Sequence, residues 1–222
     1  MDKQIRVIPA ILTDDPEALK AMVSQTEAFT DYVQFDIMDG QFVPSQSITF
    51  KHLATLTTKI EWEAHLMVKR PEDYLEGFQQ AGAKKLIFHY EATRLPPKVI
   101  AQVRSLGMEV GLAINPDTPI SEITPLTGEV DSVLFLSVYP GFYGKKFIPE
   151  VLDKVADLRN IYPEVEIGID GGIKESNIAK VIRAGANVIY IGSAIFHQEH
   201  PGDSYRRLTE LAREGLSTED NK

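Results

Sequence analysis

The segment Glu166-Ile167-Gly168-Ile169-Asp170 is one of eight short, mainly apolar runs that recur along the chain. The other seven lie at residues 7–12, 32–37, 60–67, 85–89, 109–114, 132–137 and 188–191. In a chain of 222 residues this gives about 28 residues per run, which is enough for one strand and one crossover helix. Several runs are continuously apolar, which is typical of strands in a parallel sheet that is covered on both faces.

Helical signals lie between these runs. Asp15 can cap a helix whose first residue is Pro16, where a missing N–H costs nothing. Pro71 is predicted to open another helix, and apolar residues repeat at helical spacing over 151–158 and 178–182. The Ala-Gly-Ala segments at 81–83 and 184–186 place glycine where a helix ends in the left-handed conformation.

Eight strand–helix units predict a (β/α)8 barrel that forms a single domain over residues 1–222. No low-complexity stretch or Ser/Gly linker marks a boundary, and we expect a loose tail at 217–222. A doubly wound open sheet is the alternative fold. It usually has fewer strands for its length, and no Gly-x-Gly-x-x-Gly follows the first run.

Composition excludes several classes of protein. The chain has no cysteine, which excludes disulfides, cysteine-bound zinc, iron–sulfur clusters and a thiol nucleophile. Its net charge of −9 gives no general attraction for nucleic acid or anionic lipid. The first residues, Met1-Asp2-Lys3-Gln4, lack the apolar run expected of a signal peptide, and no stretch approaches the ~18 apolar residues that a membrane span needs. We therefore expect a cytoplasmic protein with no nucleic-acid or membrane partner.

In a barrel of this kind, polar side chains at the carboxyl ends of the strands face the active site. Asp36, His65, His89 and Asp170 lie at or near the carboxyl ends of the second, third, fourth and seventh runs. Each aspartate could instead cap a helix or pair with a cation, and a strand-terminal histidine is commonly a hydrogen-bonded core residue. Together, however, Asp36, His65 and Asp170 offer the mixed nitrogen and oxygen ligands that suit a divalent metal.

Glycines follow the last two strands and predict a phosphate site. Gly171-Gly172 follows the seventh run, and Gly192-Ser193 follows the eighth and opens a short helical turn. In such barrels the loops after strands seven and eight bind phosphate through backbone N–H groups. The loop 140–146 is predicted to close over a ligand, although it could be a plain connection; its candidate ligand-binding residues are Gly141, Phe142, Tyr143 and Gly144.

Seven motifs occur in order along the chain: Phe35-Asp36-Ile37-Met38-Asp39-Gly40, Phe42-Val43-Pro44, His65-Leu66-Met67, Asn115-Pro116-x-Thr118-Pro119, Ser137-Val138-x-Pro140-Gly141-Phe142, Asp170-Gly171-Gly172-Ile173 and Gly192-Ser193-Ala194-Ile195-Phe196. As a set they resemble the ribulose-phosphate 3-epimerases from Ile8 to Phe196. That family is a (β/α)8 barrel that interconverts ribulose 5-phosphate and xylulose 5-phosphate with a divalent metal and two aspartates.

The resemblance implies a role for each candidate residue. Asp36 and Asp170 would be the acid–base pair and, with His65, would hold Zn, Fe or Mn. The phosphate of a small sugar would lie on Gly171, Gly172, Gly192 and Ser193, with His65 also contacting the substrate. Ala10, Met38 and Met67 would line the pocket. Relatives form dimers or hexamers, so we expect a homo-oligomer of unspecified size.

The chain departs from the family pattern around this site. The first histidine of the family's His-Asp-His-Asp metal set is Gln34 here, and an amide oxygen is a poorer zinc ligand than imidazole. We expect weaker metal binding, shifted toward harder ions. Further departures are Ala10 for serine, Leu136 for methionine, and Tyr143 and Lys145 for the glycine and glutamine of the loop.

Three functions follow from these residues. The first is epimerisation of a ketose phosphate at C3, with the pentose as substrate. The second is the same reaction on a ketohexose 6-phosphate, because Ala10 and Tyr143 reshape the pocket. The third is a phosphosugar-binding protein without metal or turnover, which Gln34 favours and the retained aspartate pair opposes.

Overall fold

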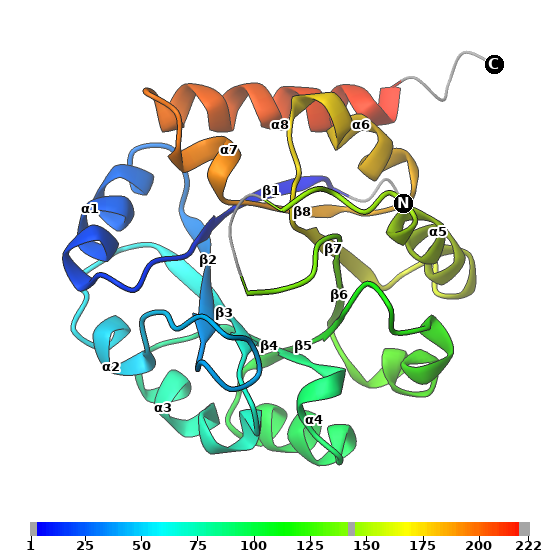
Figure 1. Ribbon diagram of the computed structural model, residues 1–222, viewed down its shortest axis with the longest axis horizontal. Helices are drawn as coiled ribbons and strands as arrows, with labels where there is room; N and C mark the ends of the chain where they lie inside the picture. Colours follow the sequence, from blue (N-terminus) through cyan, green and yellow to red (C-terminus); the bar gives the residue numbers. More distant parts are fainter. Residues whose placement is uncertain (1–3, 142–144, 218–222) are drawn as a thin grey trace.

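The computed structural model describes residues 4–141 and 145–217, and its strands form one closed ring (Figure 1). All neighbouring strands are parallel and follow chain order, and β1 pairs with β8 to close the barrel. The strands are β1 (Arg6–Ile11), β2 (Tyr32–Met38), β3 (Glu61–Met67), β4 (Lys85–His89), β5 (Glu109–Ile114), β6 (Ser132–Leu136), β7 (Glu166–Asp170) and β8 (Val188–Ile191). The predicted (β/α)8 barrel is confirmed, and an open doubly wound sheet is excluded.

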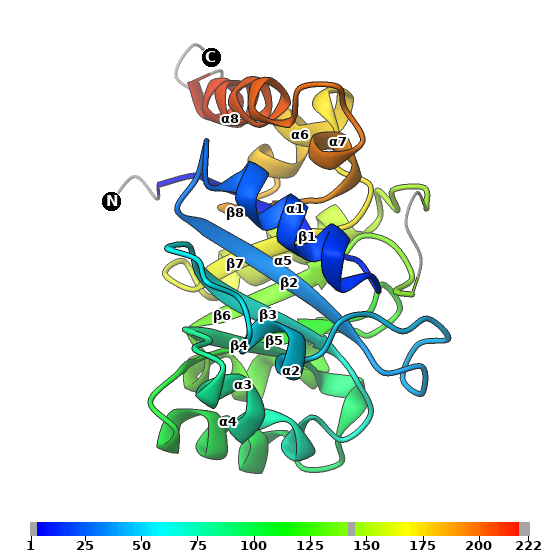
Figure 2. The ribbon, with the colours of Figure 1, turned by 90° about the vertical axis from the view of Figure 1, so that its left-hand side faces the viewer.

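Helices surround the strands (Figures 1 and 2). They are α1 (Pro16–Thr26), α2 (Phe50–Leu53), α3 (Leu75–Gln80), α4 (Pro96–Ser105), α5 (Val151–Ile161), α6 (Glu175–Arg183), α7 (Ser193–Phe196) and α8 (Pro201–Ser217). Short 3-10 helices are η1 (Pro71–Asp73), η2 (Tyr90–Ala92), η3 (Ile120–Glu122) and η4 (Thr124–Glu129). The tail predicted at 217–222 starts at the last residue of α8, and 218–222 lie outside the described residues.

Local sequence explains where several helices begin and end. The side chain of Asp15 accepts the N–H of Glu17 at 2.9 Å, so it caps α1 as predicted. Pro71 starts the 3-10 turn η1, and the α-helical part of this segment begins only at Leu75. Gly82 and Gly185 have φ of 100° and 106°, so both helix ends use the conformation that favours glycine.

The core has two layers. Outward-facing strand residues pack beneath the helices in one large cluster that includes Phe35, Leu66 and Phe88. A smaller cluster fills the barrel interior; its buried members are Ile8, Ala10, Ile87, Ala113, Leu134, Leu136, Val188 and Tyr190. The interior is thus a packed core rather than a pore, and any ligand must bind at one end of it.

An ionic network around the buried Lys85 closes the amino-terminal end of the barrel. Lys85, which is 2 % exposed, lies 2.8 Å from Glu166, and Arg6 lies 2.6 Å from the same carboxylate. These three residues are the first of β4, β7 and β1. Polar groups at this end contribute to stability, and the opposite end is free for chemistry.

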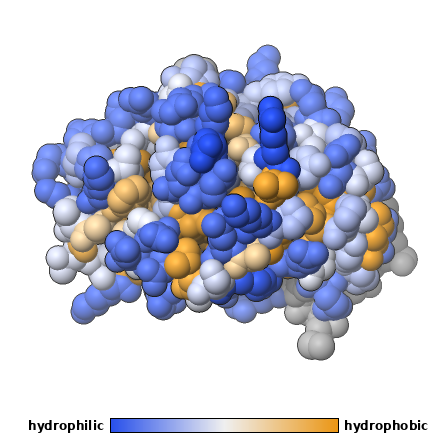
Figure 3. Space-filling model, turned by 90° about the horizontal axis from the view of Figure 1, so that it is seen from below, coloured by the Kyte–Doolittle hydropathy of each residue, from blue (hydrophilic) through white to orange (hydrophobic). Residues whose placement is uncertain are grey.

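No helix in the described part of the chain is long and apolar enough to cross a membrane. On the face of the molecule seen from below the view of Figure 1, hydrophilic side chains predominate and hydrophobic ones show only in patches between them (Figure 3).

Candidate active site

Strand register brings the predicted polar residues to one place. Asp36 on β2 is the register partner of His65 on β3, and two residues earlier Gln34 pairs with Ala10 on β1. Asp170 is the last residue of β7. Because side chains alternate along a strand, Gln34 and Asp36 point to the same side, which is the barrel interior.

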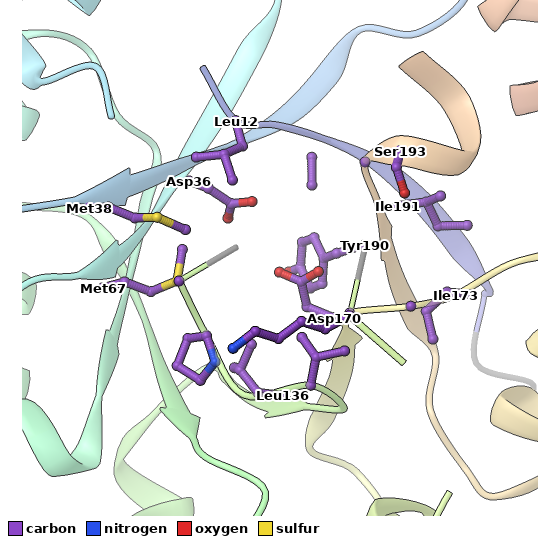
Figure 4. A pocket seen from close by; sticks show the side chains of 18 residues that line it. Leu12, Asp36, Met38, Met67, Leu136, Asp170, Ile173, Tyr190, Ile191 and Ser193 are labelled. Carbon is purple, nitrogen blue, oxygen red and sulfur yellow. The ribbon is translucent and has the colours of Figure 1, made fainter. Parts of the chain in front are cut away.

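A pocket opens at the carboxyl ends of the strands. Its lining residues come from six strands and their following loops: Ala10, Leu12, Asp36, Met38, Met67, Leu136, Val138, Pro140, Gly141, Lys145, Asp170, Gly171, Gly172, Ile173, Tyr190, Ile191, Gly192 and Ser193. In Figure 4 the carboxyl groups of Asp36 and Asp170 both project toward its centre. Met38 and Met67 lie on one side of it, and Ile191 and Ser193 on the other.

Four side chains are linked around the two carboxylates. Gln34 Nε2 donates to Asp36 Oδ1 at 3.0 Å and to Asp170 Oδ2 at 3.3 Å. His65 Nδ1 lies 3.0 Å from Asp36 Oδ1 and 3.6 Å from Asp170 Oδ2. Gln34 and His65 are fully buried, whereas the carboxylates retain slight exposure to the pocket. The two aspartates, 134 positions apart in sequence, therefore face one cavity.

Burial and mutual charge shift the pKa values of these groups. Burial, followed by repulsion from Asp170, raises the pKa of Asp36 to about 6 despite the hydrogen bond with His65. Burial alone would lower the pKa of His65, but the hydrogen bonds with Asp170 and Asp36 and their charges raise it to about 9. A carboxyl group that titrates near neutral pH is suited to accept and return protons.

A second set of contacts extends from His65 away from the pocket. His65 Nε2 lies 2.9 Å from Nε2 of His89, and His89 Nδ1 lies 3.3 Å from Glu91 Oε2. His89 is completely buried, and burial lowers its pKa to about 4. Glu91, two residues after His89 in the chain, is therefore a partner of the His89 ring.

The donor set fits a divalent metal. One ligand atom each from Asp36, His65 and Asp170 lies within 4.8 Å of the others. Gln34 Oε1 is buried, and no donor in the described part of the chain contacts it. Rotating the Gln34 amide by half a turn exchanges the positions of Oε1 and Nε2. The amide oxygen would then face the two carboxylates. Because two like-charged carboxylates and an amide oxygen repel one another, that arrangement requires a cation between them.

The predicted phosphate residues line the same pocket. Gly171 and Gly172 have φ of 109° and 66°, in the range that favours glycine. A Cβ on Gly172 would lie 3.0 Å from the backbone nitrogen of Phe147, so a larger residue would press on the chain beside it. Gly192 and Ser193 complete this side of the pocket. Backbone N–H groups can therefore approach an anion closely here.

The comparisons with known proteins agree with this geometry. A model of the ribulose-phosphate 3 epimerase family matches residues 6–196. The chain belongs to this family. Ribulose-phosphate 3-epimerase of Schizosaccharomyces pombe is 38% identical over 204 residues, covering 89% of this chain and 90% of that protein. The enzyme called the cytoplasmic isoform in Oryza sativa subsp. japonica is also 38% identical, over 205 residues, with the same coverage.

Solved structures of other enzymes share the fold. The 3-hexulose-6-phosphate synthase of Salmonella typhimurium matches with a TM-score of 0.71 at 15% identity, covering 95% of this chain and all of that one. At this identity the likeness shows the barrel alone. The epimerase family assignment comes from the sequence matches, and the relatives it contains are isomerases.

Most of the residues expected from the epimerase resemblance meet at the pocket. Ala10, Met38, Met67 and Gly141 line it, and Leu136 does so where the family has methionine. Phe142, Tyr143 and Gly144 lie outside the described residues. Sequence reasoning did not place Leu12, Ile173, Tyr190 and Ile191 in the lining. Tyr190 lies one residue before the end of β8, so the rule that pointed to Asp36 would also have pointed to it.

Proposed function

We propose that this protein epimerises a ketose phosphate at C3, with D-ribulose 5-phosphate and D-xylulose 5-phosphate as its substrate and product. One observation carries the proposal. Two carboxylates from β2 and β7, Asp36 and Asp170, face one pocket whose wall includes the glycines that follow β7 and β8. Epimerisation needs two acid–base groups and an anion site for the phosphate, and this pocket offers both.

The reaction removes the proton on C3, next to the ketone, and returns a proton to the opposite face of the same carbon. One of the two aspartates accepts the first proton and the other donates the second, so each must reach a different face of the bound sugar. Burial and Asp170 raise the pKa of Asp36 to about 6. Near neutral pH that carboxyl group can therefore both accept and release a proton. The apolar side chains of Met38 and Met67 exclude water beside it.

Proton removal leaves an enediolate whose negative charge must be stabilised. Asp36, His65 and Asp170, with the amide oxygen of Gln34, would hold a divalent cation there. That cation would supply positive charge that offsets the charge of the enediolate. A set of three oxygen ligands and one nitrogen suits Mn or Fe(II). A set with two imidazoles would suit zinc better.

The phosphate would bind to backbone N–H groups of Gly171, Gly172, Gly192 and Ser193. Lys145 also lines the pocket, where the family pattern has glutamine. A lysine here adds positive charge that attracts a doubly charged phosphate. The same residue makes the pocket different from that of relatives with a neutral loop.

One observation favours the alternative of a phosphosugar-binding protein. Gln34 Nε2 donates to both carboxylates, so the amide stabilises the pair in the absence of a metal. The two buried carboxylates argue against it, because binding a sugar phosphate without turnover does not require them and burying them is costly. Conversion of ribulose 5-phosphate, followed by NMR with Mn, Fe(II) or Zn added, decides between the two. The proposal requires turnover, with a higher kcat/KM for the pentose than for a ketohexose 6-phosphate.

We also propose that the protein acts in the cytoplasm as a homo-oligomer. The rice relative named as a cytoplasmic isoform supports the compartment. Light scattering on the purified protein would give its oligomeric state.

A further inference from the structure

The hydrogen bonds behind His65 have one direction, which follows from the contacts of Glu91. Glu91 is a carboxylate whose Oε1 accepts the N–H of Asn115 at 2.8 Å and the hydroxyl of Thr118. Its Oε2 lies 3.3 Å from His89 Nδ1. Because a carboxylate only accepts hydrogen bonds, Nδ1 of His89 must carry the proton.

The next contact then has only one possible donor. His89 is fully buried, and burial disfavours a charged imidazole, so with its single proton on Nδ1 its Nε2 can only accept. The 2.9 Å contact between the two Nε2 atoms therefore requires that His65 donates from Nε2. The remaining ring nitrogen of a neutral His65 is Nδ1, and its lone pair is aimed at Asp36 and Asp170.

We propose that Glu91, acting through His89, is a positioning residue that fixes the ring and the tautomer of His65 so that Nδ1 is free to bind a cation. The inference rests on the proposed cation site and adds to it. It also gives a role to the segment Asn115-Pro116-Asp117-Thr118, whose residues are not among those described as lining the pocket. The backbone N–H of Asn115 and the hydroxyl of Thr118 both donate to Glu91 and hold its carboxylate in place beside His89.

Removing such a partner from a metal-binding histidine typically weakens metal affinity 10- to 100-fold. Glu91→Gln is the sharpest variant, because it keeps the shape of the side chain but replaces an oxygen acceptor by a group that can also donate. We expect the zinc affinity, measured by competition with a chelator, to fall at least about tenfold. Glu122→Gln is the matched control: its exposed carboxylate accepts the hydroxyl of neighbouring Tyr90 at 2.8 Å, and zinc affinity should stay unchanged.

A spectroscopic measurement separates this role from a merely structural one. In zinc-loaded protein labelled with 15N histidine, the ring signals of His89 should show a proton on Nδ1 and none on Nε2. Protonation of Nε2 would overturn the proposal. So would a zinc affinity of folded Glu91→Gln within twofold of that of the unaltered protein, or the absence of zinc binding by the unaltered protein.

A second variant keeps the proposal open to refutation if Glu91→Gln does not fold. Thr118→Val removes the hydroxyl that holds Glu91, and we expect zinc affinity about 3- to 10-fold weaker, the usual effect of one hydrogen bond. An unchanged affinity would contradict the role of this segment. None of these readouts uses a sugar substrate, so failure of the epimerase proposal, seen as absent turnover, is distinguishable from failure of this one.

Discussion

Asp36 and His65 are register partners on β2 and β3, and Asp36 Oδ1 lies 3.0 Å from His65 Nδ1 in the closed interior of the barrel. The pairing links a candidate proton carrier to the only histidine that faces Asp170 among the described residues. It also means that His65 carries a proton in the metal-free protein, which a cation must displace when it binds. The predictions below follow from this arrangement.

Replacing either aspartate by asparagine removes one of the two acid–base groups while preserving its size. For Asp36→Asn and for Asp170→Asn we expect kcat to fall by at least ~10² in the conversion of ribulose 5-phosphate. Asp157→Asn is the control, because this carboxylate is exposed on α5 and does not line the pocket. Near-normal rates in either pocket variant would remove that residue from the acid–base pair.

Gln34→His introduces the imidazole that the epimerase family has at this position. Since Gln34 Nε2 already lies 3.0 Å from Asp36 Oδ1 and 3.3 Å from Asp170 Oδ2, the new ring would face the proposed cation. We expect zinc to bind at least about tenfold more tightly, equivalent to about 1.4 kcal/mol, in competition with a chelator. Gln79→His, at an exposed position of α3, should leave the affinity unchanged. If both variants behave alike, Gln34 does not face the metal.

The raised pKa of His65 predicts how stability depends on pH in metal-free protein. Because the folded value of about 9 lies above the ordinary 6.5, the contribution of His65 is complete below about pH 6.5 and is lost as pH rises through 9. Asp36 titrates lower, near 6, so the interval from pH 7 to 9.5 reports mainly on His65. Urea unfolding with EDTA should show a loss of about 2 kcal/mol over this interval. His65→Gln should lose markedly less, and an equal loss in both proteins would refute the assignment.

Lys145→Met removes positive charge from the pocket but keeps an aliphatic chain of similar length. If this lysine attracts the substrate phosphate, KM for ribulose 5-phosphate should rise about 10-fold or more, with a smaller change in kcat. Lys146→Met, at the exposed neighbouring position, should have no such effect. A change confined to kcat would instead place the charge of Lys145 at the reacting carbons.

The sequence predicted the barrel because its determinants are local. Each apolar run and each helix cap, such as Asp15 with Pro16, can be recognised from a few consecutive residues. The positions of Asp36, His65 and Asp170 followed from one rule about strand ends. The connection between β5 and β6 was not predicted: it folds as the 3-10 segments η3 and η4, and no apolar periodicity marks it.

Contacts between distant strands could not be predicted in the same way. That His89 contacts His65 depends on strand tilt and on the side to which each ring packs, so the sequence did not predict this contact. Gln34 donates hydrogen bonds to carboxylates on β2 and β7. The bond to β7 forms because the closed barrel brings these two strands to one interior. Lys145 reaches the pocket through a loop whose path no local pattern specifies.

The central claim is that Asp36 and Asp170 move the proton on C3 of a ketose phosphate. Its most direct test is to mix the protein with ribulose 5-phosphate in D2O, with Zn, Mn or Fe(II) added, and to follow the C3 hydrogen by NMR. The account predicts that this hydrogen is replaced by solvent deuterium while xylulose 5-phosphate forms, and that Asp36→Asn and Asp170→Asn slow the exchange. A C3 signal that persists unchanged with every metal, while the sugar phosphate binds, would contradict it and identify a binding protein.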